Sequence, residues 1–341
     1  MNDSYKATDS ILNNFKERVS FAIGTGRCGT KFIAKVIDLE PRISSVHERN
    51  PLNETFHRYS KWYDLPIDHE GFLETKAQEI QQDLDNYLFS FEASAHLSLS
   101  IQELYNRFGA KFLLLVRSPE QVVNSYLQKG WYNKPAVRAN PELAPGYQEC
   151  HAFHHSLGRI IPSGEKFWQW NQMSRVGKIA WYWNALNAKV LEQFAGIPNT
   201  HWRIEKLEDL SYSRYLEIAE FFGFQSAVTQ EMYEKLAQRP PNAKAWVPTI
   251  ATWTTSETAE FEAEVAPMAE KFSYEYRVSC LPIPQPRKPA IKQSSTKQSL
   301  TKQRTTAKLT QLGQRSKKLA ATTINGIGHI FTLNYNQPKK D

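Results

Sequence analysis

The sequence is poor in the features that mark secreted, zinc-stapled and membrane-spanning proteins. Its 341 residues hold three cysteines, which lie far apart at positions 28, 150 and 280. We therefore expect a reducing compartment, with neither a disulfide framework nor a zinc site. The first ten residues, MNDSYKATDS, lack the apolar core of a signal peptide, and no run approaches the ~20 apolar residues of a membrane helix. These absences predict a soluble, cytoplasmic protein.

The net charge of +7 is distributed unevenly along the chain. Residues 281–341 contain 12 Lys and Arg against one acidic residue, whereas the first 280 residues contain 30 against 34. This tail is rich in Pro, Gln, Thr, Ser and Lys, and such a segment buries too little apolar surface to fold alone. It is predicted to be a basic, mostly disordered tail. Two roles are open for it, a solvated terminus or a weak contact with an anionic membrane surface or polymer.

Short apolar runs alternate with helix-like spacing before this tail. Strands are predicted over 19–23, 42–46, 87–93, 111–116 and 200–204. Helices are predicted after the first strand, through Leu104 and Phe108, and over 72–84, 119–127, 176–194 and 215–222. The alternation predicts an α/β fold, a parallel sheet flanked by helices in a single domain over 15–280. Ligands of such sheets bind at the carboxyl ends of the strands, where the segment Gly24–Thr30 is expected to meet Glu48, His96 and Arg117.

A glycine-rich turn, from Gly24 to Gly29, joins the first strand to the next helix. Such a turn presents backbone N–H groups and a helix N-terminus to a phosphate, and Arg27 and Thr30 add a positive charge and a hydroxyl. The turn is not a Walker A box, because Thr30-Lys31 stands where that box has Lys-Ser/Thr. One position along a helix turns a side chain by about 100°, so Lys31 should not reach a β/γ-phosphate pair. ATP chemistry is therefore disfavoured, and a tight turn without a ligand is the alternative.

A second candidate anion site follows the apolar strand KFLLLV. Arg117 ends this strand, Ser118-Pro119 begins a helix, and Ser125 lies two helical turns further on. Ser125 can approach the same anion if the helix lies across it, whereas the alternative for Arg117 is a bridge to a nearby carboxylate. Together with the glycine-rich turn, Arg117 indicates a ligand with two separated phosphates.

At this point the sequence resembles the sulfotransferases that use 3′-phosphoadenosine-5′-phosphosulfate (PAPS). GTGRCGT (24–30) resembles their 5′-phosphosulfate loop, and VRSPEQVVNSY (116–126) resembles their 3′-phosphate motif. WRIEKLEDL (202–210) resembles a strand-and-turn segment that precedes a helix ending in FFG, here at 221–223. The resemblance covers about residues 18–276. It implies a P-loop-like domain, PAPS as the sulfuryl donor and no metal. The candidate donor-binding residues are Gly26, Arg27, Cys28, Gly29, Thr30, Lys31, Arg117 and Ser125.

The chain departs from the family pattern in two places. Cys28 stands where Ser is usual, which removes one hydroxyl contact to the 5′-phosphate. The RKG motif that holds the 3′-phosphate in cytosolic animal members is missing, and Lys244, near Trp246, is a candidate substitute.

The candidate catalytic residues are Glu48, His96 and Arg27. Sulfuryl transfer to a hydroxyl needs a group that accepts the acceptor's proton. Glu48, 21 residues after Arg27, resembles the catalytic Glu of several carbohydrate and tyrosine sulfotransferases. His96, 21 residues before Arg117, resembles the histidine base of the cytosolic small-molecule enzymes. We favour Glu48 and keep His96 as the alternative. His47 either orients Glu48 or simply ends the strand.

Aromatic residues gather in a segment without clear periodicity, residues 129–170. Aromatic faces suit sugar rings or aromatic acceptors, so this segment is a candidate acceptor-binding lid, the alternative being a structural insertion packed on the domain. Its histidines are irregularly spaced, which disfavours a metal site. Trp181 and Trp183 follow a helical pattern and are predicted to lie in the core. The aromatic residues of the lid are Trp131, Tyr132, Tyr147, Phe153, Phe167, Trp168 and Trp170.

The sequence thus predicts PAPS-dependent sulfotransfer to a hydroxyl or amine acceptor. A small molecule or a glycan, including a glycolipid, is the expected acceptor, and no nucleic-acid partner is expected. Two alternatives stay open. One is a P-loop nucleotide-dependent kinase, which the Thr30-Lys31 order disfavours. The other is a non-catalytic protein that binds adenosine bisphosphate.

Overall fold

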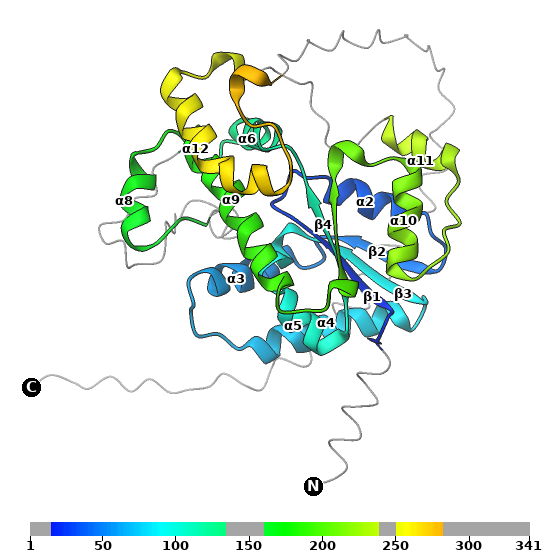
Figure 1. Ribbon diagram of the computed structural model, residues 1–341. Helices are drawn as coiled ribbons and strands as arrows, with labels where there is room; N and C mark the ends of the chain where they lie inside the picture. The colour runs from blue at the N-terminus through cyan, green and yellow to red at the C-terminus, as the bar shows by residue number, and fades with distance from the viewer. Residues whose placement is uncertain (1–14, 134–159, 239–249, 282–341) are drawn as a thin grey trace, which may run out of the picture. The chain divides into compact units, whose positions relative to one another are not determined.

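The structure, a computed structural model, describes residues 15–133, 160–238 and 250–281 (Figure 1). These residues all belong to one unit, within Met1–Arg287. Three features of the sequence analysis lie outside the described residues. They are Lys244, residues 134–159 of the candidate lid, and the tail from residue 282 onward. The domain boundary near residue 280 therefore stays a prediction.

Five parallel strands form the centre of the described part of the chain. Their order across the sheet is β2-β3-β1-β4-β5, and every neighbouring pair runs parallel. The predicted α/β fold, a parallel sheet flanked by helices, is confirmed. The strands are β1 (Val19–Ile23), β2 (Ile43–His47), β3 (Phe89–Ala93), β4 (Lys111–Val116) and β5 (Trp202–Lys206).

The two central strands, β1 and β4, are buried on both faces of the sheet. Every residue of β1 is buried, as is every residue of β4 after Lys111. Their unbroken apolar sequences predicted this, because a strand covered by helices on both sides has no polar face. Phe21 and Phe112 are register partners, and their rings stack with centroids 5.7 Å apart.

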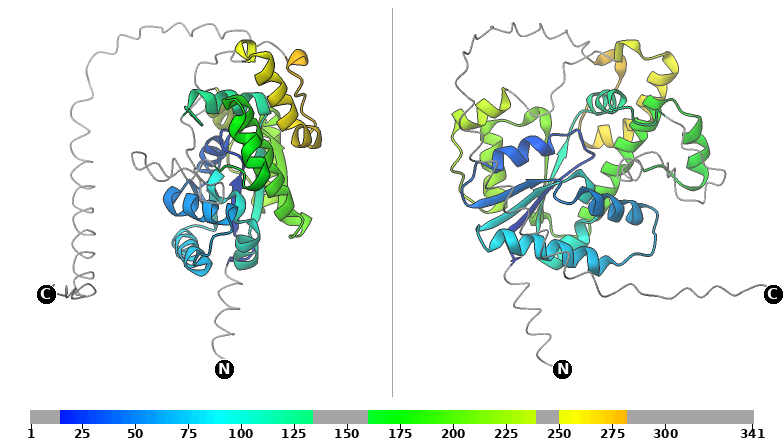
Figure 2. Two further views of the ribbon diagram at one scale, coloured as in Figure 1. Left: turned by 90° about the vertical axis from the view of Figure 1, so that its left-hand side faces the viewer. Right: turned by 180° about the vertical axis from the view of Figure 1, so that it is seen from behind.

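Helices cover both faces of this sheet, as the views of Figures 1 and 2 show. One face packs against α2 (Thr30–Ile37), α10 (Tyr212–Phe222) and α11 (Gln230–Ala237). The helices on the other face are α4 (His69–Leu84), α5 (Ile101–Phe108), α6 (Pro119–Gln128) and α9 (Arg175–Phe194), and α12 (Thr255–Lys271) packs along α9.

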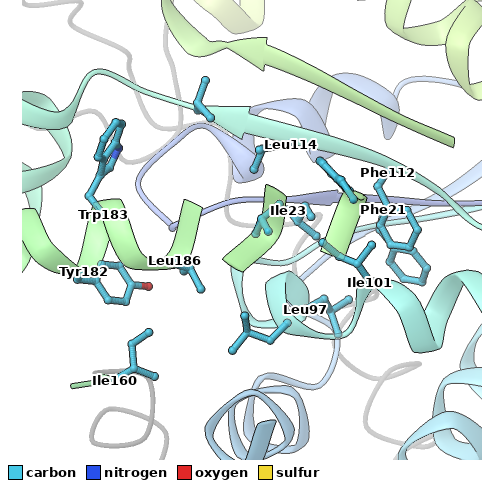
Figure 3. Close-up of a cluster of buried hydrophobic side chains, with 14 of the residues drawn as sticks. Phe21, Ile23, Leu97, Ile101, Phe112, Leu114, Ile160, Tyr182, Trp183 and Leu186 are labelled. Carbon is cyan, nitrogen blue, oxygen red and sulfur yellow. The ribbon is translucent and has the colours of Figure 1, made fainter. Parts of the chain in front are cut away.

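The larger apolar cluster lies between the sheet and α9 (Figure 3). Phe21, Ile23 and Leu114 of the sheet face Leu186 of α9, and all four are buried. Trp183 is fully buried and Trp181 nearly so, which confirms that both belong to the core. Two further 3-10 helices matter below, η1 (Ala95–Leu99) and η3 (Leu207–Asp209).

Four helices of the described residues escaped the sequence analysis, α3 (Pro51–Trp62), α8 (Gly164–Gln172), α11 and α12. The buried face of α3 is mostly polar, so it shows no apolar period to detect. Helix α12 contains Pro267, a residue that normally ends a helix, but it packs along α9 and continues. The strand predicted over 200–204 begins only at Trp202, because Asn199–His201 forms a 3-10 turn.

The chain leaves β1 and β4 in opposite directions across the sheet. From β1 it passes through α2 to β2 at one edge, and from β4 it passes through α6 and α9 to β5 at the other edge. The carboxyl ends of β1 and β4 are therefore a topological switch point, where open parallel sheets bind ligands. The glycine-rich turn follows β1, and Arg117 follows β4.

Candidate functional site

The glycine-rich turn after β1 is held in a conformation that depends on its small residues. Gly29 has φ +99° and caps α2, and a Cβ there would stand 2.5 Å from Leu207 Cδ1. A Cβ on Gly24 would stand 2.5 Å from both Cys28 Sγ and the Leu115 carbonyl oxygen. The turn thus runs close against β4 and η3, and it aims the start of α2 at the switch point.

Side chains from three other elements hold the carbonyl groups of this turn. The hydroxyls of Tyr126 on α6 and Tyr182 on α9 both donate to the Thr25 carbonyl, at 2.6 and 2.9 Å. Ser98 Oγ of η1 donates to the Gly24 carbonyl at 2.7 Å. These bonds join residues that are 74 to 157 positions apart in the sequence. The tertiary fold therefore pre-organises the turn.

The side chain of Cys28 points into the core beneath the turn. It is fully buried and packs in the cluster that includes α2 and α10. Burial raises the pKa of its thiol to about 11, although the backbone N–H groups of Gly26 and Thr30 favour the thiolate. The neutral thiol acts as a small apolar side chain.

The two predicted anion-binding arginines meet at the switch point. Arg117 Nη1 donates to the Arg27 carbonyl at 3.0 Å, so the residue after β4 directly supports the turn after β1. The same guanidinium donates to Gln121 Oε1 through Nε at 3.1 Å and Nη2 at 2.6 Å. Burial lowers the pKa of Arg117, but an arginine so placed keeps its positive charge.

Ser125 contacts Arg27 rather than Arg117. Its Oγ accepts a hydrogen bond of 2.8 Å from Arg27 Nε. The sequence pattern linked Ser125 with Arg117 through their spacing, whereas the fold places α6 so that Ser125 reaches across to the turn. The alternative interpretation of Arg117 required an ion pair with a nearby carboxylate. Among the described residues, no carboxylate forms such a pair with Arg117.

The two candidate bases, Glu48 and His96, lie beside each other. Glu48 follows β2 and His96 lies on η1 after β3, and the distance from Glu48 Oε1 to His96 Nε2 is 3.9 Å. The other nitrogen of this histidine, Nδ1, lies 3.0 Å from Thr55 Oγ1 of α3. Two residues that the sequence offered as rivals thus form one carboxylate–imidazole pair.

His47 connects this pair with the start of α2. Its Nδ1 lies 3.8 Å from Glu48 Oε2, and its Nε2 lies 3.3 Å from Thr30 Oγ1. Burial and the charge of Lys31 lower the pKa of His47, so its imidazole is neutral near pH 7. Thr30, His47 and Glu48 therefore form a continuous polar chain from the helix N-terminus to the candidate base.

The carboxyl group of Glu48 has a raised pKa. Burial and the negative charge of Glu54 raise it, whereas the cations Arg58, Lys31 and Arg27 lower it. A carboxylate with a raised pKa is a better proton acceptor, and two of these cations belong to the glycine-rich turn and the start of α2. The site thus combines positive charge with a carboxylate suited to accept a proton.

A buried ionic network holds the backbone on which Glu48 lies. Glu48 has φ +53°, a left-handed conformation that its own side chain does not favour. The next N–H groups bind buried carboxylates, with Arg49 N donating to Glu92 Oε1 at 3.0 Å and Asn50 N donating to Glu54 Oε1 at 3.1 Å. These contacts keep the turn in place.

Lys76 of α4 neutralises this network. Its Nζ lies 2.7 Å from Glu54 Oε1 and 2.9 Å from Glu92 Oε2, and all three side chains are buried. Glu54 Oε2 also accepts a bond of 2.6 Å from Ser94 Oγ, and Ser94 Oγ in turn accepts from the His96 N–H at 3.2 Å. The network therefore supports both members of the Glu48–His96 pair.

Sequence reasoning missed Glu54, Arg58, Lys76 and Glu92. Arg58 is 1 % exposed and donates to the Ala95 carbonyl at 3.1 Å. Glu54 and Arg58 lie on α3, which has no apolar stripe, Lys76 lies on the predicted helix α4, and Glu92 lies inside a strand. A single charged residue in any of these elements forms no recognisable motif. Spacing of charges at i, i+4 in PLNETFHRYSKW was the one local signal, and it does not tell a buried face from a solvated one.

The described part of the candidate lid packs on the domain. The centroid of the Trp131 ring lies 3.9 Å from that of Tyr126 and 5.0 Å from that of Tyr182. Trp170 is buried. Trp168 is 56 % exposed. Tyr147, Phe153 and the histidines at 151, 154 and 155 lie outside the described residues, so the lid stays a prediction.

Comparisons with known proteins give matches at low identity, and only among solved structures. No protein-family model matches the chain, and no curated protein matches it. Solved structures do match. A sulfotransferase domain of the Synechococcus PCC 7002 olefin synthase is 14 % identical with a TM-score of 0.39, over 75 % of this chain and 94 % of that one.

Two further matches are also sulfotransferases. Sulfotransferase STF9 from Mycobacterium avium is 12 % identical with a TM-score of 0.46, over 80 % of this chain and 81 % of that one. A sulfotransferase domain from the curacin biosynthetic pathway is 11 % identical with a TM-score of 0.40, over 75 % and 97 % of the two chains. At these similarities, the function of this chain has to be argued from its own residues.

Proposed function

We propose that the chain is a sulfotransferase that moves a sulfuryl group from PAPS to a hydroxyl or amine acceptor. The observation that carries the proposal is the junction of the two anion-binding segments. Arg117, after β4, bonds the carbonyl of Arg27 in the turn after β1. A donor with phosphates at its 3′ and 5′ positions needs two neighbouring cationic sites, one for each end of the nucleoside.

The 5′-phosphosulfate is assigned to the glycine-rich turn and the start of α2. Arg27, the hydroxyl of Thr30 and the helix N-terminus supply positive charge and donors there. The 3′-phosphate is assigned to Arg117, with Ser125 as a second contact. Ser125 Oγ accepts from Arg27 Nε, so its own hydroxyl hydrogen is available for an anion.

Glu48 is assigned as the proton acceptor. As the acceptor's oxygen or nitrogen bonds to sulfur, the bond from sulfur to the 5′-phosphate oxygen breaks and adenosine 3′,5′-bisphosphate leaves. The acceptor's proton passes to Glu48, whose raised pKa suits this transfer. His96, whose Nε2 lies 3.9 Å from Glu48 Oε1, is the alternative group to accept this proton.

The first test is transfer of ³⁵S from labelled PAPS. Purified protein is incubated with panels of hydroxyl and amine acceptors, including small molecules, glycans and glycolipids, and labelled products are separated from the donor. Binding of adenosine 3′,5′-bisphosphate, AMP and ATP is measured in parallel by calorimetry. Transfer supports the proposal. Tight bisphosphate binding without any transfer supports a non-catalytic binder instead.

The kinase alternative has a different signature. It requires that ATP binds at least as tightly as the bisphosphate and that γ-phosphate is released or transferred. The Thr30-Lys31 order argues against a kinase. A Walker A box has its lysine directly after the second glycine, where this chain has Thr30, and Lys31 comes one position later. ATP hydrolysis by the protein, lost in Lys31→Ala, would refute the sulfotransferase assignment.

A further inference from the structure

A second cluster of chemically reactive side chains lies apart from the proposed donor site. It forms where α3, α4 and α5 meet, the group of helices at the lower left of Figure 1. His57 comes from α3, His69 is the first residue of α4, and Glu103 lies in the first turn of α5. One ligand atom from each, an imidazole nitrogen or a carboxylate oxygen, lies within 4.8 Å of the other two.

The distances in this cluster suit one small cation. His57 Nε2 and His69 Nδ1 are 3.2 Å apart. Two imidazole nitrogens bound to a tetrahedral ion at about 2.0–2.1 Å stand roughly 3.3 Å from each other. The two rings are nearly perpendicular, at 87°, and meet edge to face with their centroids 5.4 Å apart.

The cluster also has the support that metal-binding histidines usually have. His57 Nδ1 lies 2.9 Å from Ser100 Oγ, so a proton on Nδ1 leaves the lone pair on Nε2 for a metal. The His57 ring stacks on Phe72 at 3.7 Å and is almost fully buried, which fixes its orientation. His69 and Glu103 are partly exposed and leave a path for entry.

We propose that His57, His69 and Glu103 bind a divalent transition-metal ion of the zinc class. Two imidazoles and one carboxylate favour Zn²⁺ and its neighbours over Mg²⁺ or Ca²⁺, which take oxygen ligands. The site uses no cysteine, and for this reason the cysteine count of the sequence did not reveal it. Its role is structural, since one ion would join three helices.

The contacts of the cluster without a metal provide a competing explanation. The two histidines can share a hydrogen bond, and Lys61 forms an ion pair with Glu103. The two explanations differ in what Lys61 does. If Glu103 is a metal ligand, the ammonium of Lys61 competes with the ion for the carboxylate, so removing Lys61 strengthens metal binding.

Zinc titration of the untagged full-length chain tests the site. The background is Cys150→Ser with Cys280→Ser, so that thiols outside the buried Cys28 do not compete for zinc. The protein is stripped with chelator and titrated with ZnCl₂ by calorimetry, and with CoCl₂ to record the visible absorption of the bound ion. One equivalent of zinc should bind and raise the melting temperature.

The variants make the test specific. His69→Ala and Glu103→Gln should each weaken zinc binding by at least the ~10-fold typical of losing a supporting partner. Lys61→Gln should tighten it about two- to fivefold, the worth of one exposed ion pair. His201→Ala, a histidine outside the cluster, is the matched control and should bind as the parent does. Absence of zinc binding, equal binding by His69→Ala and the control, or weaker binding by Lys61→Gln would each overturn the proposal. Circular dichroism in chelator verifies that each variant is folded.

Discussion

At the scale of single residues, the pair formed by Glu48 and His96 is the feature with the most chemical consequence. Thr55 Oγ1 lies within hydrogen-bond distance of His96 Nδ1, and His47 Nδ1 lies 3.8 Å from Glu48 Oε2. An imidazole beside a carboxylate can orient it, stabilise its charge or exchange roles with it. Because the two residues are neighbours, their positions do not identify which of them takes the proton. The turnover rates of variants do.

Glu48→Gln should lower turnover by about 10²–10⁴-fold, the usual effect of losing a general base. Binding of adenosine 3′,5′-bisphosphate should barely change, because Glu48 is assigned to the acceptor. His96→Ala should cost much less. Turnover is measured for both, with Glu220→Gln on the exposed side of α10 as control. If His96→Ala abolishes turnover while Glu48→Gln retains most of it, the histidine is the base.

The raised pKa of Glu48 also predicts a pH profile. A base works only when ionised, so turnover should fall as the pH drops through a value above the ordinary 4.5 of a glutamate. The acid limb of kcat against pH reports this value. A limb at or below the ordinary value would contradict the assignment.

Arg117→Ala should weaken adenosine 3′,5′-bisphosphate by about tenfold or more, since a charge-assisted hydrogen bond contributes about 1.5–3 kcal/mol. AMP, which lacks the 3′-phosphate, should lose little. Calorimetry with both ligands measures the difference, and Arg107→Ala on α5 serves as the control. Equal losses for the two ligands would show that Arg117 acts only by supporting the turn through the Arg27 carbonyl.

At the scale of elements, α3 and α4 bring charge into the interior to shape the end of β2. Lys76, Glu54 and Glu92 are buried together, and one positive charge faces more than one carboxylate. Burial and the charge of Glu54 raise the pKa of Glu92 to about 8, so Glu92 keeps its proton near neutral pH. The network is thus balanced by protonation of one member.

Glu92 should make the fold less stable as the pH rises. Its pKa is near 4.5 when unfolded and about 8 when folded, so the folded state holds the extra proton between these values. Stability from this group is full at low pH and is lost as the pH rises to about 8. Glu92→Gln, which mimics the protonated acid, should remove this dependence.

Melting temperatures from pH 6 to pH 9 test this expectation. The difference between Glu92→Gln and the parent should grow in favour of the variant as the pH rises. Glu79→Gln, at the more exposed side of Lys76, is the matched control and should follow the parent. Parallel curves for Glu92→Gln and the parent would mean that Glu92 is already ionised in the folded chain.

At the scale of the whole molecule, the described residues form a parallel sheet covered by helices, and none of their helices is long and apolar enough to cross a bilayer. The last described turn, Val278–Cys280, is joined to α12 by a bond of 2.7 Å from the Val278 N–H to Glu262 Oε1. This contact indicates where the chain can be shortened.

A chain ending at Leu281 should melt at the same temperature as the full chain and keep its turnover on a soluble acceptor. The basic tail has too few apolar residues to add a core, and no motif of the resemblance lies in it. A chain ending at Arg277 loses the Val278 contact and should melt lower. If the cut at Leu281 alone lowers the melting temperature by several degrees, the tail stabilises the domain.

Local sequence patterns were enough to predict the parallel sheet and the phosphate-binding turn. Unbroken apolar runs located β1 and β4, and the alternation with helices gave the parallel sheet. The turn of glycines before Thr30 indicated a phosphate-binding loop, because φ values near those of Gly26 and Gly29 suit few other residues. Helix α3 escaped because its buried face is polar.

By itself the sequence determined the strands, most of the helices that flank them and the sheet class, and it placed Arg27, Glu48, His96 and Arg117 after the ends of strands. These features depend on short-range periodicity and turn chemistry. Only the tertiary structure decided which of these residues touch. It joined Ser125 to Arg27, placed Glu48 beside His96 and buried Lys76 with two glutamates. Such contacts depend on how helices pack across the sheet, and that packing is set by the sum of many weak contacts between residues far apart in the chain.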